Sequence, residues 1–176
     1  ALGQESKVED NNGVAIGKKA ESTKDSAIAL GFESKSTGNQ SVAIGLQTNA
    51  TNKQAVAVGS KSQATGENSI AVGNAANASN TFSVALGSST TSTNQYTTAV
   101  GGKAEATQEG ATALGYEAKA TAINTIAIGN LAKAEKVGVI ALGSTAAATG
   151  DDTVAIGNSA TAKKNGDIIL GKDAKS

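Results

Sequence analysis

The sequence predicts an all-β solenoid in which every 14 residues form one flattened coil containing two short parallel strands. Glycine recurs every 14 residues without insertion or deletion, an apolar stretch precedes each of these glycines, and a second alternating stretch follows it. Repetition at such a short period is typical of solenoids, because each repeat can bury its apolar residues only against its neighbours. Residues at the same position in successive repeats would therefore form columns running along the stack.

The periodic glycine ends a stretch such as Val14-Ala15-Ile16-Gly17. A residue that recurs without exception between two strands is best explained by a positive φ, or by a backbone contact that a Cβ would block. We therefore predict a structural turn at Gly17, Gly31, Gly45, Gly59, Gly73, Gly87, Gly101, Gly115, Gly129, Gly143, Gly157 and Gly171.

The stretch before each glycine predicts a strand covered on both faces. Val, Ile or Leu stands three residues and one residue before the glycine, except at Thr98 and Thr112, and alanine stands between them in every repeat but the last. We expect the large side chains to point into the coil and the alanines to face outward. A flat alanine stripe would let copies of the chain associate, as two or three copies. The predicted trimer face is Ala15, Ala29, Ala43, Ala57, Ala71, Ala85, Ala99, Ala113, Ala127, Ala141 and Ala155.

The stretch after each glycine predicts a second strand with one solvated face. Small residues stand three and five residues after the glycine, and a mostly polar residue such as Glu21 stands between them. The next corner, seven to nine residues after the glycine, is rich in turn formers, as in Gly66-Glu67-Asn68. Opposite charges lie one coil apart at Glu21 and Lys35 and at Lys19 and Glu33, which favours stacking of the coils.

Composition limits the classes of function. Fifteen lysines balance fifteen carboxylates, so the chain has no basic field for nucleic acid or for an anionic membrane surface. No apolar run is long enough to span a bilayer, and we expect this segment to make no membrane contact. Because the sequence opens in the middle of a repeat, we expect residues 1–176 to be a single repeat domain of about twelve coils within a longer chain.

The sequence offers no catalytic constellation. It contains no histidine and no cysteine, so neither an ordinary catalytic triad nor a zinc site can be assembled. The carboxylates are spread over surface columns rather than grouped. We therefore predict a protein that is not an enzyme and that carries no metal and no cofactor.

Bulky residues in otherwise polar columns are the best candidates for ligand contacts, because large anchors of this kind are favoured in protein interfaces. Phe82 and Tyr96 share one corner column in consecutive coils and should lie one above the other. The alternative is that such residues pack at subunit edges or cover the corners. The candidates are Phe32, Leu46, Phe82, Tyr96, Tyr116 and Leu131.

The repeat resembles the head repeats of trimeric autotransporter adhesins, the YadA-like family. The motif is Asn/Asp-Ser/Thr-Val/Ile-Ala-Ile/Val/Leu-Gly, and it stands in full at Asn68-Ser69-Ile70-Ala71-Val72-Gly73 and in the stretches 124–129 and 152–157. The resemblance implies a left-handed parallel β-roll that assembles as a homotrimer on the outer surface of a Gram-negative bacterium, anchored by a region outside this chain. It also implies adhesion to host extracellular matrix proteins (collagen, laminin or fibronectin) or to host cell-surface receptors, with autoagglutination as a further activity.

Two other functions stay open at this point. The repeats could form a structural spacer that carries another binding tip away from the cell. An ice-binding solenoid is the third candidate function. Such a protein needs a threonine column on a flat sheet, and a column that includes Thr23, Thr37 and Thr51 follows the edge of the exposed strand.

Overall fold

The computed structural model describes residues 1–176 as short strands joined by turns, with no helix. The fold is an all-β parallel β-solenoid of about twelve turns with repeats about 14 residues apart, which confirms the predicted class. The chain divides into two compact units, Ala1–Ser89 and Thr90–Ser176, and each is described by itself. The left-handed coil and the homotrimer remain predictions.

Two parallel sheets build the first unit, one from the even-numbered strands and one from the odd-numbered strands. The even-numbered strands are β2 (Val14–Ile16), β4 (Ile28–Leu30), β6 (Val42–Ile44), β8 (Val56–Val58), β10 (Ile70–Val72) and β12 (Val84–Leu86). The odd-numbered strands are β1 (Lys7–Val8), β3 (Glu21–Ser22), β5 (Lys35–Ser36), β7 (Asn49–Ala50), β9 (Gln63–Ala64) and β11 (Asn77–Ala78).

The second unit repeats this arrangement. Its even-numbered strands are β14 (Thr98–Val100), β16 (Thr112–Leu114), β18 (Ile126–Ile128), β20 (Ile140–Leu142), β22 (Val154–Ile156) and β24 (Ile168–Leu170). Its odd-numbered strands are β13 (Thr91–Ser92), β15 (Glu105–Ala106), β17 (Lys119–Ala120), β19 (Lys133–Ala134), β21 (Ala147–Ala148) and β23 (Thr161–Ala162).

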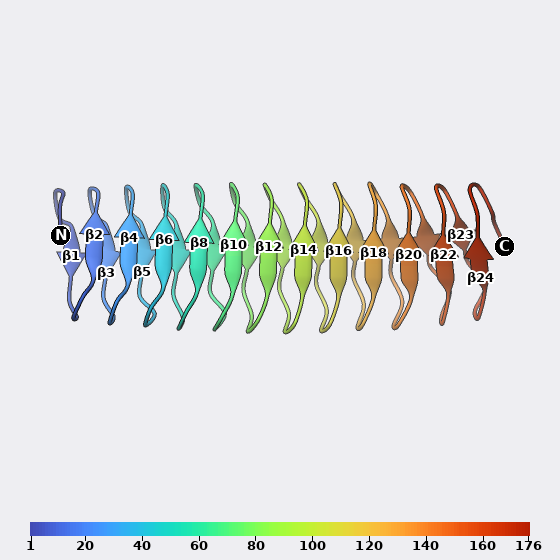
Figure 1. Cartoon of the computed structure of the whole chain (residues 1–176), viewed down its shortest axis with the longest axis horizontal. Helices are drawn as coiled ribbons and strands as arrows, with labels where there is room; N and C mark the ends of the chain where they lie inside the picture. Colours follow the sequence, from blue (N-terminus) through green and yellow to red (C-terminus); the bar gives the residue numbers. More distant parts are fainter. The chain divides into compact units, whose positions relative to one another are not determined.

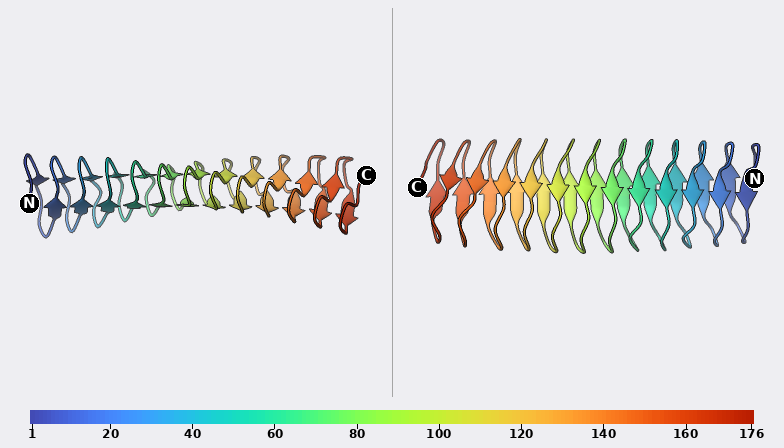
Figure 2. Two further views of the ribbon diagram at one scale, coloured as in Figure 1. Left: turned by 90° about the horizontal axis from the view of Figure 1, so that it is seen from above. Right: turned by 180° about the vertical axis from the view of Figure 1, so that it is seen from behind.

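Within each unit the equivalent strands of successive coils pair in parallel, so identical positions stand side by side. Ala71 of β10, for example, pairs with Ala57 of β8 and with Ala85 of β12. Within each unit the two sheets form two layers joined by turns at both edges (Figures 1 and 2). The columns expected from the sequence are therefore present as hydrogen-bonded ladders.

The interior between the two sheets is filled by small side chains, and here the structure corrects the sequence prediction. The whole alanine column from Ala15 to Ala155 is inaccessible to solvent, whereas Ile16, beside Ala15, is 44% exposed. Val139 is the largest side chain that is fully buried. Because the facing columns are mainly alanine, serine and threonine, the sheets approach too closely to enclose a whole column of Val or Ile, and Val139 is a single exception. The alanines cannot form the trimer face, and the prediction that they do is wrong.

Polar groups inside the coil have hydrogen-bond partners. Ser41 Oγ lies 2.6 Å from Ser36 Oγ and donates to the carbonyl oxygen of Gly38 at 2.7 Å. Thr48 Oγ1 donates to the carbonyl oxygen of Gly59 at 2.8 Å. No buried side-chain nitrogen or oxygen is left without a partner, so serine and threonine can share the interior with alanine at little cost.

The periodic glycines meet both conditions predicted from their recurrence, a positive φ and a backbone contact that a Cβ would block. Gly59 has a φ of 120°, and a Cβ built on it would lie 2.6 Å from the carbonyl oxygen of Gly73 in the next coil. All the glycines from Gly17 to Gly171 in this column have φ values between 120° and 139°. A side chain at this corner would therefore be strained and would push the coils apart.

Each coil has two tight turns, and the third residue of each adopts the left-handed conformation. The amide of Ala20 donates to Gly17, and the amide of Ala27 donates to Lys24, which closes the two turns around Lys19 and Ser26. Lys19 has a φ of 57° and Ser26 a φ of 55°. The second of these positions falls among the predicted turn formers, while the first carries no glycine or asparagine signal and was not expected.

Charged side chains on the outer face of the odd-numbered sheets link successive coils. Lys35 Nζ lies 3.4 Å from Glu21 Oε2, and Lys119 Nζ lies 3.1 Å from Glu105 Oε1. The expected pair of Lys19 and Glu33 does not form, and Glu33 Oε2 accepts a hydrogen bond from Gln47 Nε2 at 2.9 Å. These exposed pairs support the register of the coils and add little to overall stability.

A further ion pair joins Lys103 Nζ to Glu117 Oε1 at 3.0 Å. The hydrogen bond from Lys103, followed by one with Tyr116, lowers the pKa of the Glu117 carboxyl below its ordinary value, and contacts with Glu117 and Tyr116 raise the pKa of Lys103. Since the folded-state pKa of Glu117 is depressed, its contribution to stability is present above the unfolded-state pKa. It is lost as the pH falls through the folded-state value.

The narrow interior predicts that Ala71→Leu destabilises the fold. A leucine here overpacks the space between the sheets, which costs about 1–3 kcal/mol. Denaturant unfolding at fixed protein concentration measures the change, and Asn77→Leu on the solvated outer face is the control. Equal tolerance of both variants would contradict the enclosed position of the alanine column.

The ion pair predicts that Lys103→Met raises the pKa of the Glu117 carboxyl, because the variant removes the first donor to the carboxylate. A ¹³C NMR pH titration of the Glu117 carboxyl measures the shift. Lys61→Met changes a lysine at the same position of another coil and should leave that pKa unchanged. An unchanged Glu117 titration in Lys103→Met would refute the assigned cause.

Candidate binding surfaces

The outer face of each even-numbered sheet is lined with large aliphatic side chains, interrupted by Thr98 and Thr112, and the chain itself leaves most of them partly exposed. We call it the aliphatic face. In the first unit it comprises Val14, Ile16, Ile28, Leu30, Val42, Ile44, Val56, Val58, Ile70, Val72, Val84 and Leu86. In the second unit it comprises Thr98, Val100, Thr112, Leu114, Ile126, Ile128, Ile140, Leu142, Val154, Ile156, Ile168 and Leu170. Contiguous apolar surface of this kind marks an interaction site.

Phe32 and Leu46 lie at the edge of the aliphatic face in the first unit. Each directly follows a periodic glycine, and both side chains are exposed. They belong to consecutive coils, where the amide of Gln47 donates to the carbonyl oxygen of Phe32 at 2.8 Å. The two side chains therefore extend the apolar surface around the corner, so either a ligand or a neighbouring subunit can reach them.

Phe82 and Tyr96 occupy the other corner, at the left-handed position of the second turn. Their φ values are 56° and 58°, and both side chains are exposed. A left-handed conformation is uncommon for a bulky residue. Phe82 belongs to the first unit and Tyr96 to the second, so their predicted stacking remains a prediction.

Tyr116 and Leu131 occupy the glycine corner of neighbouring coils in the second unit. The amide of Leu131 donates to the carbonyl oxygen of Tyr116 at 2.9 Å. Lys103 Nζ lies 5.7 Å from the centre of the Tyr116 ring and 3.5 Å from its hydroxyl oxygen. The contacts with Lys103 orient a tyrosine that is still 49% exposed.

All six candidate residues are thus exposed. Within the first unit Phe82 stands at the opposite corner of the coil from Phe32 and Leu46, and within the second unit Tyr96 stands at the opposite corner from Tyr116 and Leu131. Sequence reasoning missed two exposed apolar residues, Ile123 and Val137, which stand in consecutive coils at a turn position that is mostly polar elsewhere. The sequence signal that could have identified them is the presence of two β-branched apolar residues in a column that is otherwise mostly polar.

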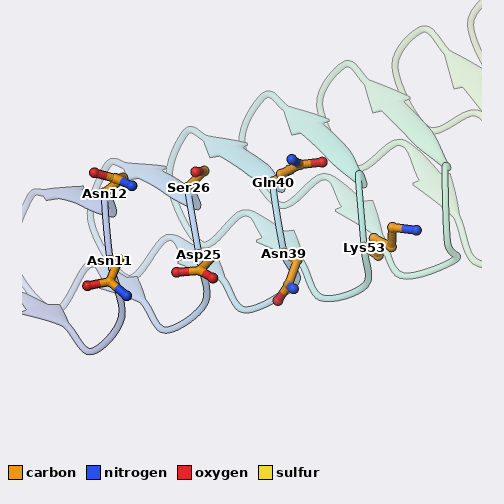
Figure 3. Close-up of a pocket in the computed structure, with 7 residues that line it drawn as sticks. All are labelled: Asn11, Asn12, Asp25, Ser26, Asn39, Gln40 and Lys53. Carbon is orange, nitrogen blue, oxygen red and sulfur yellow. The ribbon is translucent and has the colours of Figure 1, made fainter.

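An open polar groove lies along the second turn of the first four coils, and sequence reasoning missed it as well. It encloses about 600 Å³ and is lined by Asn11, Asn12, Asp25, Ser26, Asn39, Gln40 and Lys53 (Figure 3). Successive turns contribute these side chains in two rows, one with Asn11, Asp25 and Asn39 and one with Asn12, Ser26 and Gln40 (Figure 3). Neighbouring polar residues from separate repeats form one continuous lining.

Clusters of metal ligands and membrane-spanning helices are both absent from the structure. No group of three or more histidine, cysteine, aspartate or glutamate side chains is placed to hold a metal ion. No helix is long and apolar enough to cross a membrane.

The sequence matches the YadA head domain repeat (2 copies) in successive, partly overlapping windows at residues 1–20, 22–48, 36–62, 50–76, 64–90, 92–118, 120–146 and 148–168. A comparison with curated proteins gave no significant match. YadA head repeats are found in adhesin heads of trimeric autotransporters, which are surface-exposed and non-enzymatic. The match covers almost the whole length with the same repeat that the structure displays, and the chain therefore belongs to the YadA head family.

Proposed function

We propose that the chain forms a homotrimeric head on the outer side of a bacterial outer membrane and attaches the cell to host extracellular matrix proteins or host cell-surface receptors. Membership of the YadA head family supports the adhesive role. The observation that carries the proposal is the contrast between the two sheets. One presents a half-exposed aliphatic face suited to self-association, while the polar sheet and the corners stay available to a ligand.

The aliphatic face is the proposed subunit interface, in place of the alanine column. Its side chains recur on every coil, and many are more than a third exposed, as at Ile44 and Leu114. The interior of one chain buries mainly alanine, so it gains little hydrophobic free energy by itself. Three left-handed rolls around one axis would bury all three aliphatic faces in a closed arrangement.

Ligand binding is assigned to the exposed bulky residues at the corners. Phe82 and Tyr96 stand on turns, where an extended matrix protein can reach them without disturbing the strands. Each contact would be weak, but three copies of every corner in one head would add avidity. Collagen, laminin and fibronectin are the proposed ligands, and contact between heads on neighbouring cells would explain autoagglutination.

A spacer is the second candidate function. The regularity of the coils supports it, because the same strands and turns recur without a specialised loop. A spacer would hold another tip away from the cell and would bind no matrix protein itself. Ice binding has less support, since the threonine column lies beside charged residues such as Glu21 and Lys35.

The interface predicts that Ile70→Asp together with Val72→Asp prevents trimer formation. Each subunit would bring two carboxylates into an apolar interface, where desolvation and like-charge repulsion disfavour association. Light scattering coupled to size-exclusion chromatography measures the mass, and circular dichroism reports strand content. Gln63→Asp with Asn77→Asp on the opposite sheet is the control and should remain trimeric. A trimer formed equally by both variants would exclude the aliphatic face as the interface.

The corner residues predict that Phe82→Asn with Tyr96→Asn weakens adhesion by about tenfold or more, which is the effect of losing two modest anchors. Asparagine tolerates the left-handed φ and already occupies this position at Asn68 and Asn124, so the turns should persist. Solid-phase binding to collagen, laminin and fibronectin gives the measurement. Gln54→Asn is the control at an equivalent turn. Undiminished adhesion would remove both aromatic residues from the proposal, and an unmodified head that binds no matrix protein would favour the spacer.

A further inference from the structure

We propose that the polar groove along residues 11–53 binds a neutral glycan chain. The inference depends on the proposed adhesive function, since it adds a second class of host ligand to it. The groove lies on the second turn, away from the glycine corner where Phe32 and Leu46 stand. Its lining contains no aliphatic or aromatic side chain, so an apolar ligand would gain nothing there.

The lining side chains have unused hydrogen-bonding capacity. No hydrogen bond or ion pair within the chain engages the side chains of Asn12, Asp25 or Asn39. Side-chain amides donate and accept hydrogen bonds, and a carboxylate accepts hydrogen bonds at each of its two oxygens. Together they match the hydroxyl groups of sugars, which also donate and accept hydrogen bonds. Ser26, the shortest side chain of its row, lies between Asn12 and Gln40 and leaves space there (Figure 3).

The groove is rigid because its backbone is hydrogen bonded from coil to coil. The amide of Ser26 donates to Asn11 at 3.0 Å, that of Gln40 to Asp25 at 2.8 Å, and that of Gln54 to Asn39 at 2.8 Å. A preorganised site loses less entropy when a ligand binds. Because these backbone groups are already paired, the edge cannot accept a peptide as an added strand, and only side chains remain to recognise a ligand.

Charge favours a neutral ligand over an anionic one. Lys53 is the only cation in the lining, and its Nζ lies 3.7 Å from Glu67 Oε1. Asp25 places an unpaired carboxylate in the centre of the groove, where it would repel sulfate, phosphate or carboxylate groups. Sulfated and sialylated glycans are therefore disfavoured.

The spacing of successive coils in the groove is similar to the spacing of successive units in a polymeric ligand. Parallel strands of successive coils lie about 4.8 Å apart, which is close to the length of one sugar residue in an extended glycan. Successive turns can therefore present equivalent polar groups to successive sugars. An elongated neutral oligosaccharide lying along the turns is the ligand that this spacing fits.

The purified wild-type head is tested on a printed array of neutral oligosaccharides, with heparin and sialylated glycans as anionic probes. The groove variant is Asp25→Ala with Asn39→Ala. Its control is Asp151→Ala with Asn165→Ala, which changes the same residue types at the same turn position in the second unit, where Asn165 Nδ2 donates to Asp151 Oδ2 at 3.2 Å. The dissociation constant for the neutral oligosaccharide that gives the strongest signal is then measured by calorimetry, and circular dichroism confirms that each variant is folded.

We expect the groove variant to bind that oligosaccharide at least about tenfold more weakly, while the control keeps wild-type affinity. Absence of neutral glycan binding, binding confined to the anionic probes, or equal loss in both variants would overturn the proposal. Binding to matrix proteins is measured in parallel on the same preparations. A wild-type head that binds matrix protein but no glycan refutes only the groove, whereas a head that binds neither refutes the adhesive function as well.

Discussion

The close approach of the two sheets within each coil decides where every large side chain of this protein can go. Four columns of alanine, serine and threonine face one another across the interior, and no buried polar atom is left unpaired. Tight turns close both edges, and the periodic glycines allow one coil to rest on the next without a side chain between them. The space that remains is too narrow for most branched aliphatic side chains.

The aliphatic residues consequently lie on the outside of a coil whose interior holds almost no bulk. This inverts the usual relation between core and surface, because alanine fills the interior while the larger aliphatic side chains of the same strands stay partly exposed. In the proposed homotrimer, folding and association would be linked, because covering the aliphatic face would supply free energy that the small interior does not. This exposed apolar surface is the physical basis of the homotrimer proposed above.

The turns are the part of the repeat where residue type varies most freely. Strand positions are restricted to small residues inside and to aliphatic residues on one outer face, while the left-handed turn positions hold lysine, glutamine, asparagine, phenylalanine or tyrosine. Variation at a rigid corner changes the surface chemistry without moving the scaffold. The exposed aromatic residues and the amide-lined groove are two products of this freedom, and they differ in surface chemistry.

The sequence alone determined the period, the strand and turn positions, the need for glycine at one corner and the columns that stack, because a strict repeat makes each of these visible as a regularity. It did not determine which side of the aliphatic strand faces inward. Alternation shows that Ala71 points opposite to Ile70 and Val72, but either side could be the interior. Only the tertiary structure decided this, because the answer depends on the width left between two sheets whose facing residues lie several positions apart. The same holds for the groove from Asn11 to Lys53, whose residues become neighbours only when successive coils stack.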